Sequence, residues 1–344
     1  MSEPLLEVRD LVKRFPLPRT LVDAALGRPH DAVRAVDGVS FTLRRGRTLG
    51  LVGESGCGKS TLARCILRLY DADQGQVRLD GVDLMRLGEA DLIPYRKRMQ
   101  VVFQDPYASL NPRQRVGRTL SEVLEVHGIG TPAERRRRVE HLLDQVGLRP
   151  ADAHKYPGEF SGGQRQRIGI ARALAVEPEL LIADEPLSAL DVSIQAQILQ
   201  LLLDLRASLG LTMIFISHDL RVVRYLSDDV AVMYLGKIVE RAPAALLFAR
   251  PRHPYTMALL SAVPEIGGAR HEMVPIEGEP PSAVRIPEGC RFHPRCPWRM
   301  ERCLRQSPEL TELLPAHFVA CHVAEDRLAA GDVAGTARLP SGLP

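Results

Sequence analysis

The fold is decided by the stretch Gly53-Glu54-Ser55-Gly56-Cys57-Gly58-Lys59-Ser60-Thr61. An apolar run, residues 48–52, comes before it, and Leu62, Ile66 and Leu69 follow at helical spacing. A strand, a glycine-rich loop and a helix in this order predict a phosphate-binding loop. The glycines let backbone N–H groups face phosphate oxygens, and the start of the helix adds positive potential. A glycine-rich turn without a ligand is the alternative that the motif alone leaves open.

Two side chains of this loop carry chemistry. Lys59 supplies a positive charge for the β- and γ-phosphates of a nucleotide, and Ser60 supplies a hydroxyl ligand for Mg²⁺. We therefore predict that all nine residues bind the nucleotide and that Lys59 also serves catalysis. Cys57 and Cys65 need no role beyond that of small buried residues.

Four short apolar runs predict buried parallel strands, because such strands are covered on both faces and lack polar alternation. Helical patterns alternate with them, as after Asp191, where the pattern closes at Gly210. Strands that alternate with helices indicate an α/β fold with an open parallel sheet. The runs are residues 48–52, 101–103, 180–183 and 213–216.

The third of these strands ends in two carboxylates, Asp184 and Glu185. A carboxylate at the C-terminal edge of a parallel strand points into the ligand crevice. Asp184 can hold Mg²⁺, directly or through water, and Glu185 can polarise a water for in-line attack on the γ-phosphate. An ordinary surface acidic pair is the alternative, and the phosphate-binding loop earlier in the chain argues against it.

A second helix start lies at Ser161-Gly162-Gly163-Gln164-Arg165. Ser161 and Gln164 have the spacing of a capping box, and the two glycines expose the first N–H groups of the helix. The result is a second anion-binding helix end in a chain with one phosphate-binding loop. It indicates a nucleotide site that closes between two chains, although a plain helix cap has the same pattern.

These motifs, in this order, resemble those of the ATP-binding subunit of an ABC transporter over about residues 5–245. The resemblance implies a P-loop NTPase with a RecA-like core and a mixed sheet, an antiparallel β subdomain, a helical signature subdomain and a small cysteine-containing C-terminal appendage. It also implies roles. Gln104 is similar to the loop glutamine that senses Mg²⁺, and Ser188 to Asp191 resemble the loop that crosses the dimer interface. His218 resembles the histidine that contacts the γ-phosphate, and Phe15 the aromatic residue that stacks on adenine. A satisfied histidine and a core phenylalanine are the alternatives for these two.

A narrower resemblance points to the oligopeptide/dipeptide importer branch and extends to about residue 323. It rests on residues 103–112, the long loop 16–32, His253-Pro254-Tyr255-Thr256 and residues 278–282. The branch also serves nickel and some saccharides, so either solute is the alternative to a peptide. The resemblance implies a second ATPase subunit, expected to be a different chain, two membrane permease subunits and an extracytoplasmic solute-binding protein. It places the chain as a peripheral subunit at the cytoplasmic face of the inner membrane.

The last 94 residues differ in composition, with 13 of the 26 prolines and four of the six cysteines. Four thiols in a reducing compartment indicate a metal more than disulfides. The spacing lacks a C-x-x-C pair, which favours a [4Fe–4S] cluster over zinc, and some ATPases of this branch resemble cluster carriers here. A cluster, zinc and no metal all stay open, with His293 and His322 as substitute ligands. The four candidate ligands are Cys290, Cys296, Cys303 and Cys321.

Composition excludes several other classes. The net charge is +3 for 344 residues, too small to imply a nucleic-acid binder, and we expect no nucleic-acid partner. No run of about 20 apolar residues predicts a membrane span, and the first residues lack the pattern of an export signal. Only 57 residues separate Gln104 from Ser161, too few for the coiled coil of DNA-repair relatives, and ribosome-acting relatives usually carry two phosphate loops. Glu185 argues against a redox or sensor module in which ATP is only regulatory.

We therefore expect three parts. Residues 1–250 form an ABC-type nucleotide-binding domain whose helical subdomain spans about 105–178. Residues 251–323 form the C-terminal domain of the oligopeptide/dipeptide transporter type, and 324–344 form a flexible tail. The cofactors expected are ATP with Mg²⁺, and the cluster if the cysteines hold one.

Overall fold

The computed structural model describes residues 3–18, 31–105, 110–188, 190–262, 276 and 278–332. Most of the predicted loop 16–32, part of the stretch 103–112 and Ala189 lie outside the described residues. The chain divides into two compact units. Unit 1 comprises the described residues up to Leu6, Leu43–Thr48 and Leu79–Ser217; unit 2 comprises Glu7–Thr42, Leu49–Arg78 and those from His218 onward.

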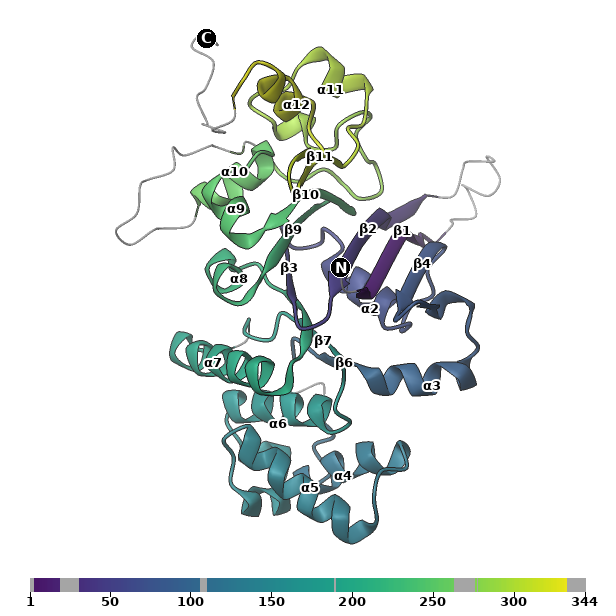
Figure 1. Cartoon of the computed structure of the whole chain (residues 1–344), viewed down its shortest axis with the longest axis vertical. Coiled ribbons are helices and arrows are strands. Elements are labelled where there is room, and N and C mark those ends of the chain that lie inside the picture. Colours follow the sequence, from purple (N-terminus) through teal and green to yellow (C-terminus); the bar gives the residue numbers. More distant parts are fainter. Residues whose placement is uncertain are drawn as a thin grey trace. The chain divides into compact units, whose positions relative to one another are not determined.

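Unit 1 contains a parallel three-stranded sheet in the order β6-β7-β8, of which β6 and β7 are labelled in Figure 1. All five residues of β7 and of β8 are buried, which agrees with the prediction from their apolar sequences. In register, Val102 pairs with Ala183, and Asp184 pairs with Ile216. The strands are β6 (Met99–Val102), β7 (Leu180–Asp184) and β8 (Thr212–Ile216), with the short β5 (Val82–Asp83) earlier in the chain.

The helices of unit 1 start and end where the sequence predicts. Thr131 caps α5 with a complete capping box, and Gly210, in the left-handed region at φ 63°, ends α7. The run after Gln104 is mostly helical, as predicted. The helices are α3 (Glu89–Arg98), α4 (Val116–Val126), α5 (Pro132–Gln145), α6 (Gly162–Leu174) and α7 (Val192–Leu209), with 3₁₀ turns at Leu84–Arg86, Pro150–His154 and Pro157–Glu159.

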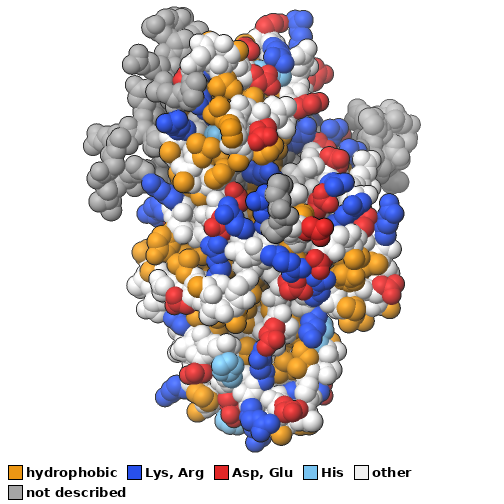
Figure 2. All heavy atoms as spheres, viewed as in Figure 1, with side chains coloured by type: hydrophobic (Ala, Val, Ile, Leu, Met, Phe, Trp, Pro, Cys, Tyr) orange, Lys and Arg blue, Asp and Glu red, His pale blue; other side chains and the backbone are white. Residues whose placement is uncertain are grey.

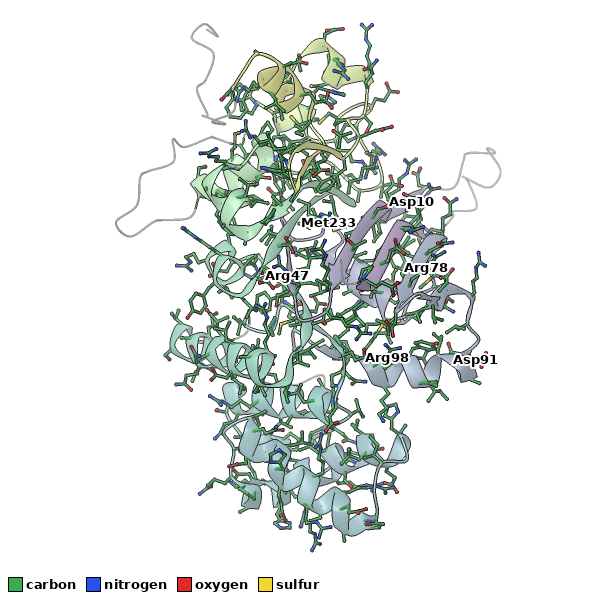
Figure 3. All side chains as sticks on the ribbon, in the orientation of Figure 1. Asp10, Arg47, Arg78, Asp91, Arg98 and Met233 are labelled. Atoms are coloured by element: carbon green, nitrogen blue, oxygen red, sulfur yellow. The ribbon has the colours of Figure 1, made fainter. Side chains whose placement is uncertain are left out.

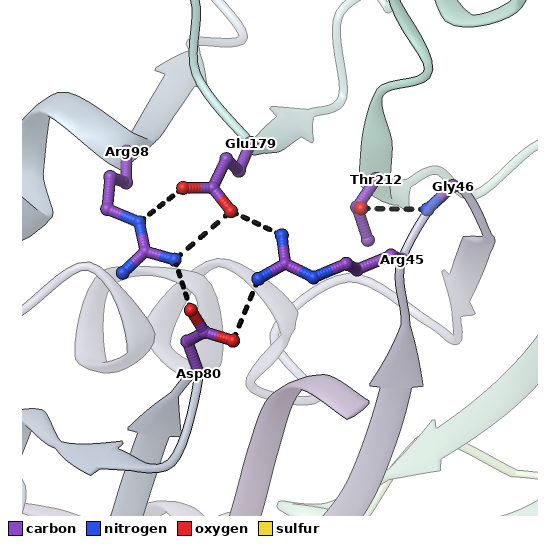
Figure 4. A network of polar contacts seen from close by, with 6 residues as sticks. All are labelled: Arg45, Gly46, Asp80, Arg98, Glu179 and Thr212. Carbon is purple, nitrogen blue, oxygen red and sulfur yellow. Dashed lines mark hydrogen bonds and ion pairs between the residues drawn. The ribbon is translucent and has the colours of Figure 1, made fainter. Parts of the chain in front are cut away.

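An ion-pair network stabilises the N-terminal ends of the strands in unit 1 (Figure 4). Glu179, just before β7, forms ion pairs with both Arg98 and Arg45. Asp80 bonds the same two guanidinium groups, at 3.0 Å and 2.8 Å. The hydrogen bonds from Arg98 and Arg45 lower the pKa of the Glu179 carboxyl below its usual range. These charges lie at the opposite edge of the sheet from Asp184, so we assign them to stability and not to chemistry.

Unit 2 contains the strand that leads into the phosphate-binding loop. This strand, β3, is parallel to β9, which is antiparallel to β10, so the sheet is mixed as expected. Strand β12 lies between β10 and β11, antiparallel to both, and β2, β1 and β4 are neighbours in a separate sheet. The strands are β1 (Pro4–Pro16), β2 (Ala32–Arg44), β3 (Thr48–Val52), β4 (Gln74–Leu79), β9 (Asp229–Tyr234), β10 (Lys237–Pro243), β11 (Thr311–Leu314) and β12 (His317–Val319).

The helices of unit 2 include one that corrects a prediction. Residues 324–329 belong to α12 and not to a flexible tail, because Ala324 packs with Val319 and Cys321 in a small apolar cluster. Residues 333–344 lie outside the described part of the chain. The helices are α2 (Lys59–Ile66), α8 (Leu220–Leu226), α9 (Ala244–Ala249), α10 (Pro254–Ser261), α11 (Glu301–Arg305) and α12 (His322–Ala329), with a 3₁₀ turn at His293–Arg295.

Two further findings concern the surface. In the part of the chain that the structure describes, none of the helices has the length and apolar character that crossing a bilayer requires. Basic and acidic side chains are mixed on the face shown in Figure 2, which agrees with the small net charge.

Candidate nucleotide-binding site

The phosphate-binding loop of unit 2 holds its lysine in place without a ligand. The Lys59 side chain is 5% exposed, and its Nζ donates to the carbonyl of Gly53 at 2.7 Å and to that of Glu54 at 3.1 Å. These bonds hold the ammonium group against the backbone of its own loop. The loop and α2 therefore form the preorganised cationic site that the sequence predicts.

Two glycines let the loop lie close to its neighbours. Gly53 has φ 151° and Gly58 has φ 109°, both outside the usual range of residues with a side chain. A Cβ on Gly53 would lie 2.2 Å from the carbonyl oxygen of Met233, which is labelled in Figure 3. A Cβ on Gly58 would lie 1.9 Å from the carbonyl oxygen of Ala35. Glycine is therefore required at both positions by the packing of β9 and β2 against the loop.

Phe15 is half-buried at the end of β1. Its ring meets the edge of Tyr70 at a centroid distance of 5.5 Å, and Lys13 Nζ lies 5.4 Å from its centre. These contacts hold the ring in place within unit 2. Both alternatives, a ring that stacks on adenine and a core phenylalanine, are consistent with them. Its predicted role at the base stays a prediction.

The two carboxylates of unit 1 lie at the C-terminal end of β7, as predicted. Asp184 is 5% exposed, and Glu185 follows it with φ 46°, in the left-handed region. The Glu185 N–H donates to the carbonyl of Ile216 at 3.0 Å, which ties this strained residue to the end of β8. The backbone turn therefore makes the two adjacent side chains leave the strand in different directions.

Gln104 lies next to Glu185. Its Nε2 donates to Glu185 Oε2 at 3.4 Å, so the structure brings together two of the residues predicted to serve hydrolysis. The oxygen donors of unit 1 at this place, a buried carboxylate at Asp184 and the amide oxygen of Gln104, are of the kind that Mg²⁺ prefers.

The segment after Glu185 is fixed by side-chain contacts. Ser188 Oγ donates to the carbonyl of Glu185 at 3.0 Å. Gln195 Nε2 donates to the carbonyls of Leu187 and Leu190, both at 3.0 Å. Asp191 is the residue before α7 and makes no side-chain cap bond. The segment from Glu185 to Asp191 is therefore held by hydrogen bonds from Ser188 and Gln195. The Asp191 carboxylate forms no bond to the start of α7.

The second helix start has the capping box that the sequence predicts. The Gln164 N–H donates to Ser161 Oγ at 3.3 Å, and the Ser161 N–H donates to Gln164 Oε1 at 3.0 Å. A Cβ on Gly163 would lie 2.4 Å from Ile194 Cγ2, so a glycine is needed where α6 meets α7. Gly162 begins the helix beside Leu190. Unit 1 thus carries the signature, Gln104, Asp184 and Glu185.

His218 lies in unit 2 and is exposed, two residues after the end of β8. The next residue, Asp219, caps α8 by accepting the Arg221 N–H at 2.9 Å. The hydrogen bond from the Arg221 side chain lowers the pKa of Asp219. The contact of this exposed ring with the γ-phosphate stays a prediction.

The structure does not support a metal site at the four C-terminal cysteines. Among the described residues, which include all four, no group of three His, Cys, Asp or Glu side chains could hold a metal ion. The thiols instead pack into apolar surroundings: Cys296 lies against Trp298 and Met257, and Cys321 lies with Val319. Burial raises the pKa of the Cys296 thiol to about 12. Neither a [4Fe–4S] cluster nor zinc is supported by this arrangement.

The two substitute ligands are also engaged elsewhere. His293 Nδ1 lies 2.9 Å from the carbonyl of Cys290. His322 has one ring nitrogen 3.3 Å from Glu325 and the other 3.0 Å from the carbonyl of Gln306. Both ring nitrogens of His322 therefore have protein partners, whereas the contact of His293 involves Nδ1 alone.

Two residues at the phosphate-binding loop are not predicted from the sequence. Tyr255 and Arg295, more than 200 positions away in the sequence, both bond to Glu54. The motif that contains Tyr255 is recognisable in the sequence, but it does not indicate which residue the tyrosine hydroxyl contacts. Arg295 has no motif of its own, so only the tertiary structure reveals it.

Comparison with known proteins agrees with this arrangement. The family model described as ABC transporter matches residues 36–188. The model described as the C-terminal region of oligopeptide/dipeptide transporters matches residues 239–303. The first match contains the phosphate-binding loop, the signature and both carboxylates, and the second contains Tyr255 and Arg295.

Individual relatives cover nearly the whole chain. It is 52% identical to the oligopeptide transport ATP-binding protein AppF of Bacillus subtilis, over 94% of this chain and 98% of that protein. It is 50% identical to a probable peptide ABC transporter ATP-binding protein of Sinorhizobium fredii, over 96% of this chain and 93% of that protein.

Among solved structures, the dimeric ATP-binding cassette MJ0796 with ADP and Pi has a TM-score of 0.61 and 27% identity to this chain, covering 70% of this chain and 98% of the cassette. This likeness agrees with the predicted P-loop NTPase fold. The chain belongs to the ABC transporter family, as an ATP-binding subunit of the oligopeptide/dipeptide branch.

Proposed function

We propose that this chain hydrolyses Mg-ATP to drive the import of peptides through a membrane permease. The observation that carries the proposal is the match along nearly the full chain to an oligopeptide transport ATP-binding protein, which includes the C-terminal region typical of that branch. The preorganised phosphate-binding loop supplies the chemistry, with Lys59 already held against its backbone.

Each residue of the site has a role in this proposal. The N–H groups of Gly53 to Thr61 and the Lys59 ammonium bind the phosphates, and Phe15 stacks on the adenine. Ser60, Asp184 and Gln104 hold Mg²⁺, which when bound neutralises charge that develops on the phosphates. Glu185 accepts a proton from the attacking water, and His218 orients that water beside the γ-phosphate.

The site is completed by a second ATPase subunit. The Ser161 hydroxyl and the first N–H groups of α6 form an anion-binding helix end in unit 1. The phosphate-binding loop already has the start of α2 for the nucleotide that it binds, so the start of α6 is available for a second nucleotide. We infer that Ser161 to Gln164 and Asp191 serve the nucleotide bound by the partner subunit, and that the partner is a different ATPase chain.

The remaining partners follow from transport. We infer two permease subunits, an extracytoplasmic solute-binding protein and a peripheral position at the cytoplasmic face of the inner membrane. We also infer that residues 1–250 act as the nucleotide-binding domain and 251–323 as the C-terminal domain. The solute contacts other subunits in this proposal, so its identity as a peptide rests on the branch, and nickel or a saccharide is the alternative.

One experiment tests the proposal as a whole. The tagged chain is isolated from membranes in mild detergent, and its co-purifying proteins are identified by mass spectrometry. We expect two permeases, a second ATPase and a peptide-binding protein, with ATP hydrolysis that increases when the loaded binding protein is added. Co-purification with ribosomes or with DNA instead would contradict the proposal, and a nickel- or sugar-binding protein would correct the solute.

A further inference from the structure

The motif His253-Pro254-Tyr255-Thr256 has no part in ATP chemistry as described above, and the structure shows what it builds. The His253 ring is buried, which lowers its pKa to about 4, so its neutral Nδ1 accepts the Tyr255 N–H at 3.0 Å. Pro254 occupies the first position of α10. The motif is therefore a rigid helix start that holds Tyr255 in one orientation.

This helix start is anchored to the mixed sheet by a buried carboxylate. Glu240, on β10, accepts the N–H groups of Arg252 at 2.7 Å and of His253 at 3.0 Å. The same carboxylate lies 2.6 Å from Nε2 of His317 on β12, and both side chains are fully buried. Three segments of unit 2 thus meet at Glu240, and together they fix where α10 begins.

From this anchored helix start, the Tyr255 side chain reaches the phosphate-binding loop. Its hydroxyl oxygen accepts the N–H of Glu54 at 2.8 Å, and its ring packs on Tyr234 and Phe292 at centroid distances of 4.7 and 5.5 Å. The tyrosine is completely buried. It therefore holds the backbone of the second residue of the loop.

A second contact holds the side chain of the same residue. Arg295 Nη1 and Nη2 donate to the two carboxylate oxygens of Glu54 at 3.0 and 3.1 Å, a bidentate pair. The Arg295 side chain is 8% exposed and that of Glu54 26%. The Arg295 guanidinium also lies 6.0 Å from the centre of the Tyr234 ring. A bidentate pair of this kind fixes the orientation of both side chains, which a single exposed contact does not.

The contacts of Tyr255 and Arg295 with Glu54 also fix the position of the Lys59 ammonium group. Lys59 Nζ is held by the carbonyls of Gly53 and Glu54, and these lie on either side of the N–H that Tyr255 binds. Any shift of Glu54 would move both acceptors of the ammonium group. In addition, an unpaired carboxylate at Glu54 would place a negative charge in a loop that binds anionic phosphates.

We propose that Tyr255 and Arg295 are positioning residues for the phosphate-binding loop, through which the C-terminal region sets the affinity for ATP. Tyr255 fixes the loop backbone that orients Lys59, and Arg295 neutralises Glu54 and fixes its side chain. The C-terminal region is then part of the nucleotide site's supporting shell. This inference rests on the proposed function, since it needs a loop that binds ATP.

Nucleotide binding to the purified full chain tests the inference, with a fluorescent ATP analogue as the probe and KM and kcat measured on the assembled transporter. For Arg295→Met we expect Kd and KM to rise about tenfold with kcat within about twofold of the parent. Arg299→Met is the control: this exposed arginine lies four positions later, and we expect parental values. Tyr255→Phe, which removes only the hydroxyl, raises Kd about threefold.

A double variant separates positioning from a general effect on folding. Glu54→Gln removes the charge that Arg295 neutralises, so adding it to Arg295→Met restores most of the lost affinity. If Arg295→Met binds like the parent, or if Glu54→Gln restores nothing, the inference is wrong. Should Arg295→Met not fold, Arg295→Gln keeps a polar side chain and removes the charge that neutralises Glu54, and an unchanged Kd in that variant contradicts the inference. A parent chain that binds no ATP would instead refute the proposed function.

Discussion

The side-chain amide of Gln104 donates to the carboxylate of Glu185 across 3.4 Å, at the C-terminal edge of the sheet in unit 1. The contact links the residue proposed to sense Mg²⁺ with the residue proposed to activate water. Glu185 is also the residue whose backbone is held in the left-handed region, at φ 46°. A ligand bound at Gln104 would therefore lie beside the carboxylate that we propose as the base.

Glu185→Gln removes the base and keeps the shape of the side chain. We expect the rate of ATP hydrolysis to fall at least about 100-fold, because an amide accepts no proton from water. The affinity for ATP stays close to that of the parent, since the phosphate-binding loop is untouched. Phosphate release and binding of a fluorescent ATP analogue measure the two effects. Hydrolysis at the parental rate would show that another group is the base.

Lys59→Ala tests the contribution of the lysine to ATP binding. The ammonium exchanges its two carbonyl partners for phosphate oxygens, and without it the affinity for ATP falls about 100-fold. Isothermal titration calorimetry measures the change. Lys97→Ala, on α3 of unit 1, is the control and leaves the affinity unchanged. Unaltered ATP binding by Lys59→Ala would contradict the role of the loop.

Ser161→Ala tests the signature helix. Loss of the cap lowers the free energy of unfolding by about 1 kcal/mol. Thr131→Ala removes a matched capping box from α5 and carries the same stability cost. We expect ATP hydrolysis by the assembled transporter to fall about tenfold for Ser161→Ala only, with ATP binding to the isolated chain unchanged in both. Equal activities of the two variants would reduce Ser161 to a helix cap.

Glu179→Gln tests the ion-pair network of unit 1 as a function of pH. The hydrogen bonds from Arg98 and Arg45 lower the folded-state pKa of Glu179 below its ordinary value of 4.5. A lowered pKa stabilises the fold above the ordinary value, and this contribution is lost as pH falls through the folded-state pKa. At pH 7 we expect Glu179→Gln to lower the free energy of unfolding by about 1 kcal/mol, a modest figure because the carboxylate is one-third exposed.

Chemical denaturation at several pH values measures this difference, which shrinks once the pH drops well below 4.5. Glu177→Gln is the control, since Glu177 pairs with Arg138 at the surface and is 73% exposed. A difference between parent and Glu179→Gln that stays constant from pH 7 to pH 3 would show that the charge of Glu179 contributes nothing.

The sequence predicts the parts of this protein whose chemistry is local. The loop that ends at Lys59, the capping box at Ser161 and the buried strand before Asp184 each have a pattern that extends over fewer than ten residues. Backbone propensity and burial decide such elements, so they can be predicted before the fold is known. Their predicted positions agree with the structure to within a residue or two.

What the sequence does not predict depends on contacts between distant segments. Arg295 meets Glu54 across 241 positions, and no periodicity or spacing indicates that pair. For the four C-terminal cysteines, the number of possible ligands does not decide between a cluster, zinc and no metal, and the described residues include no group that could hold a metal ion. In the structure Cys296 and Cys321 pack in apolar surroundings that share Val323, and their thiols are close enough to interact electrostatically. The end of α12 was missed because its packing on β12 is a tertiary effect.

The central claim is that two ATPase subunits share each nucleotide, and one structure tests it most directly. The assembled transporter, isolated through this chain with Glu185→Gln and saturated with Mg-ATP, is solved by electron cryomicroscopy. We predict that the nucleotide on Lys59 of this chain has a γ-phosphate within hydrogen-bond distance of a signature serine from the other ATPase subunit, and that Ser161 contacts the nucleotide bound there. The claim is contradicted if each nucleotide contacts one chain only and Ser161 faces solvent.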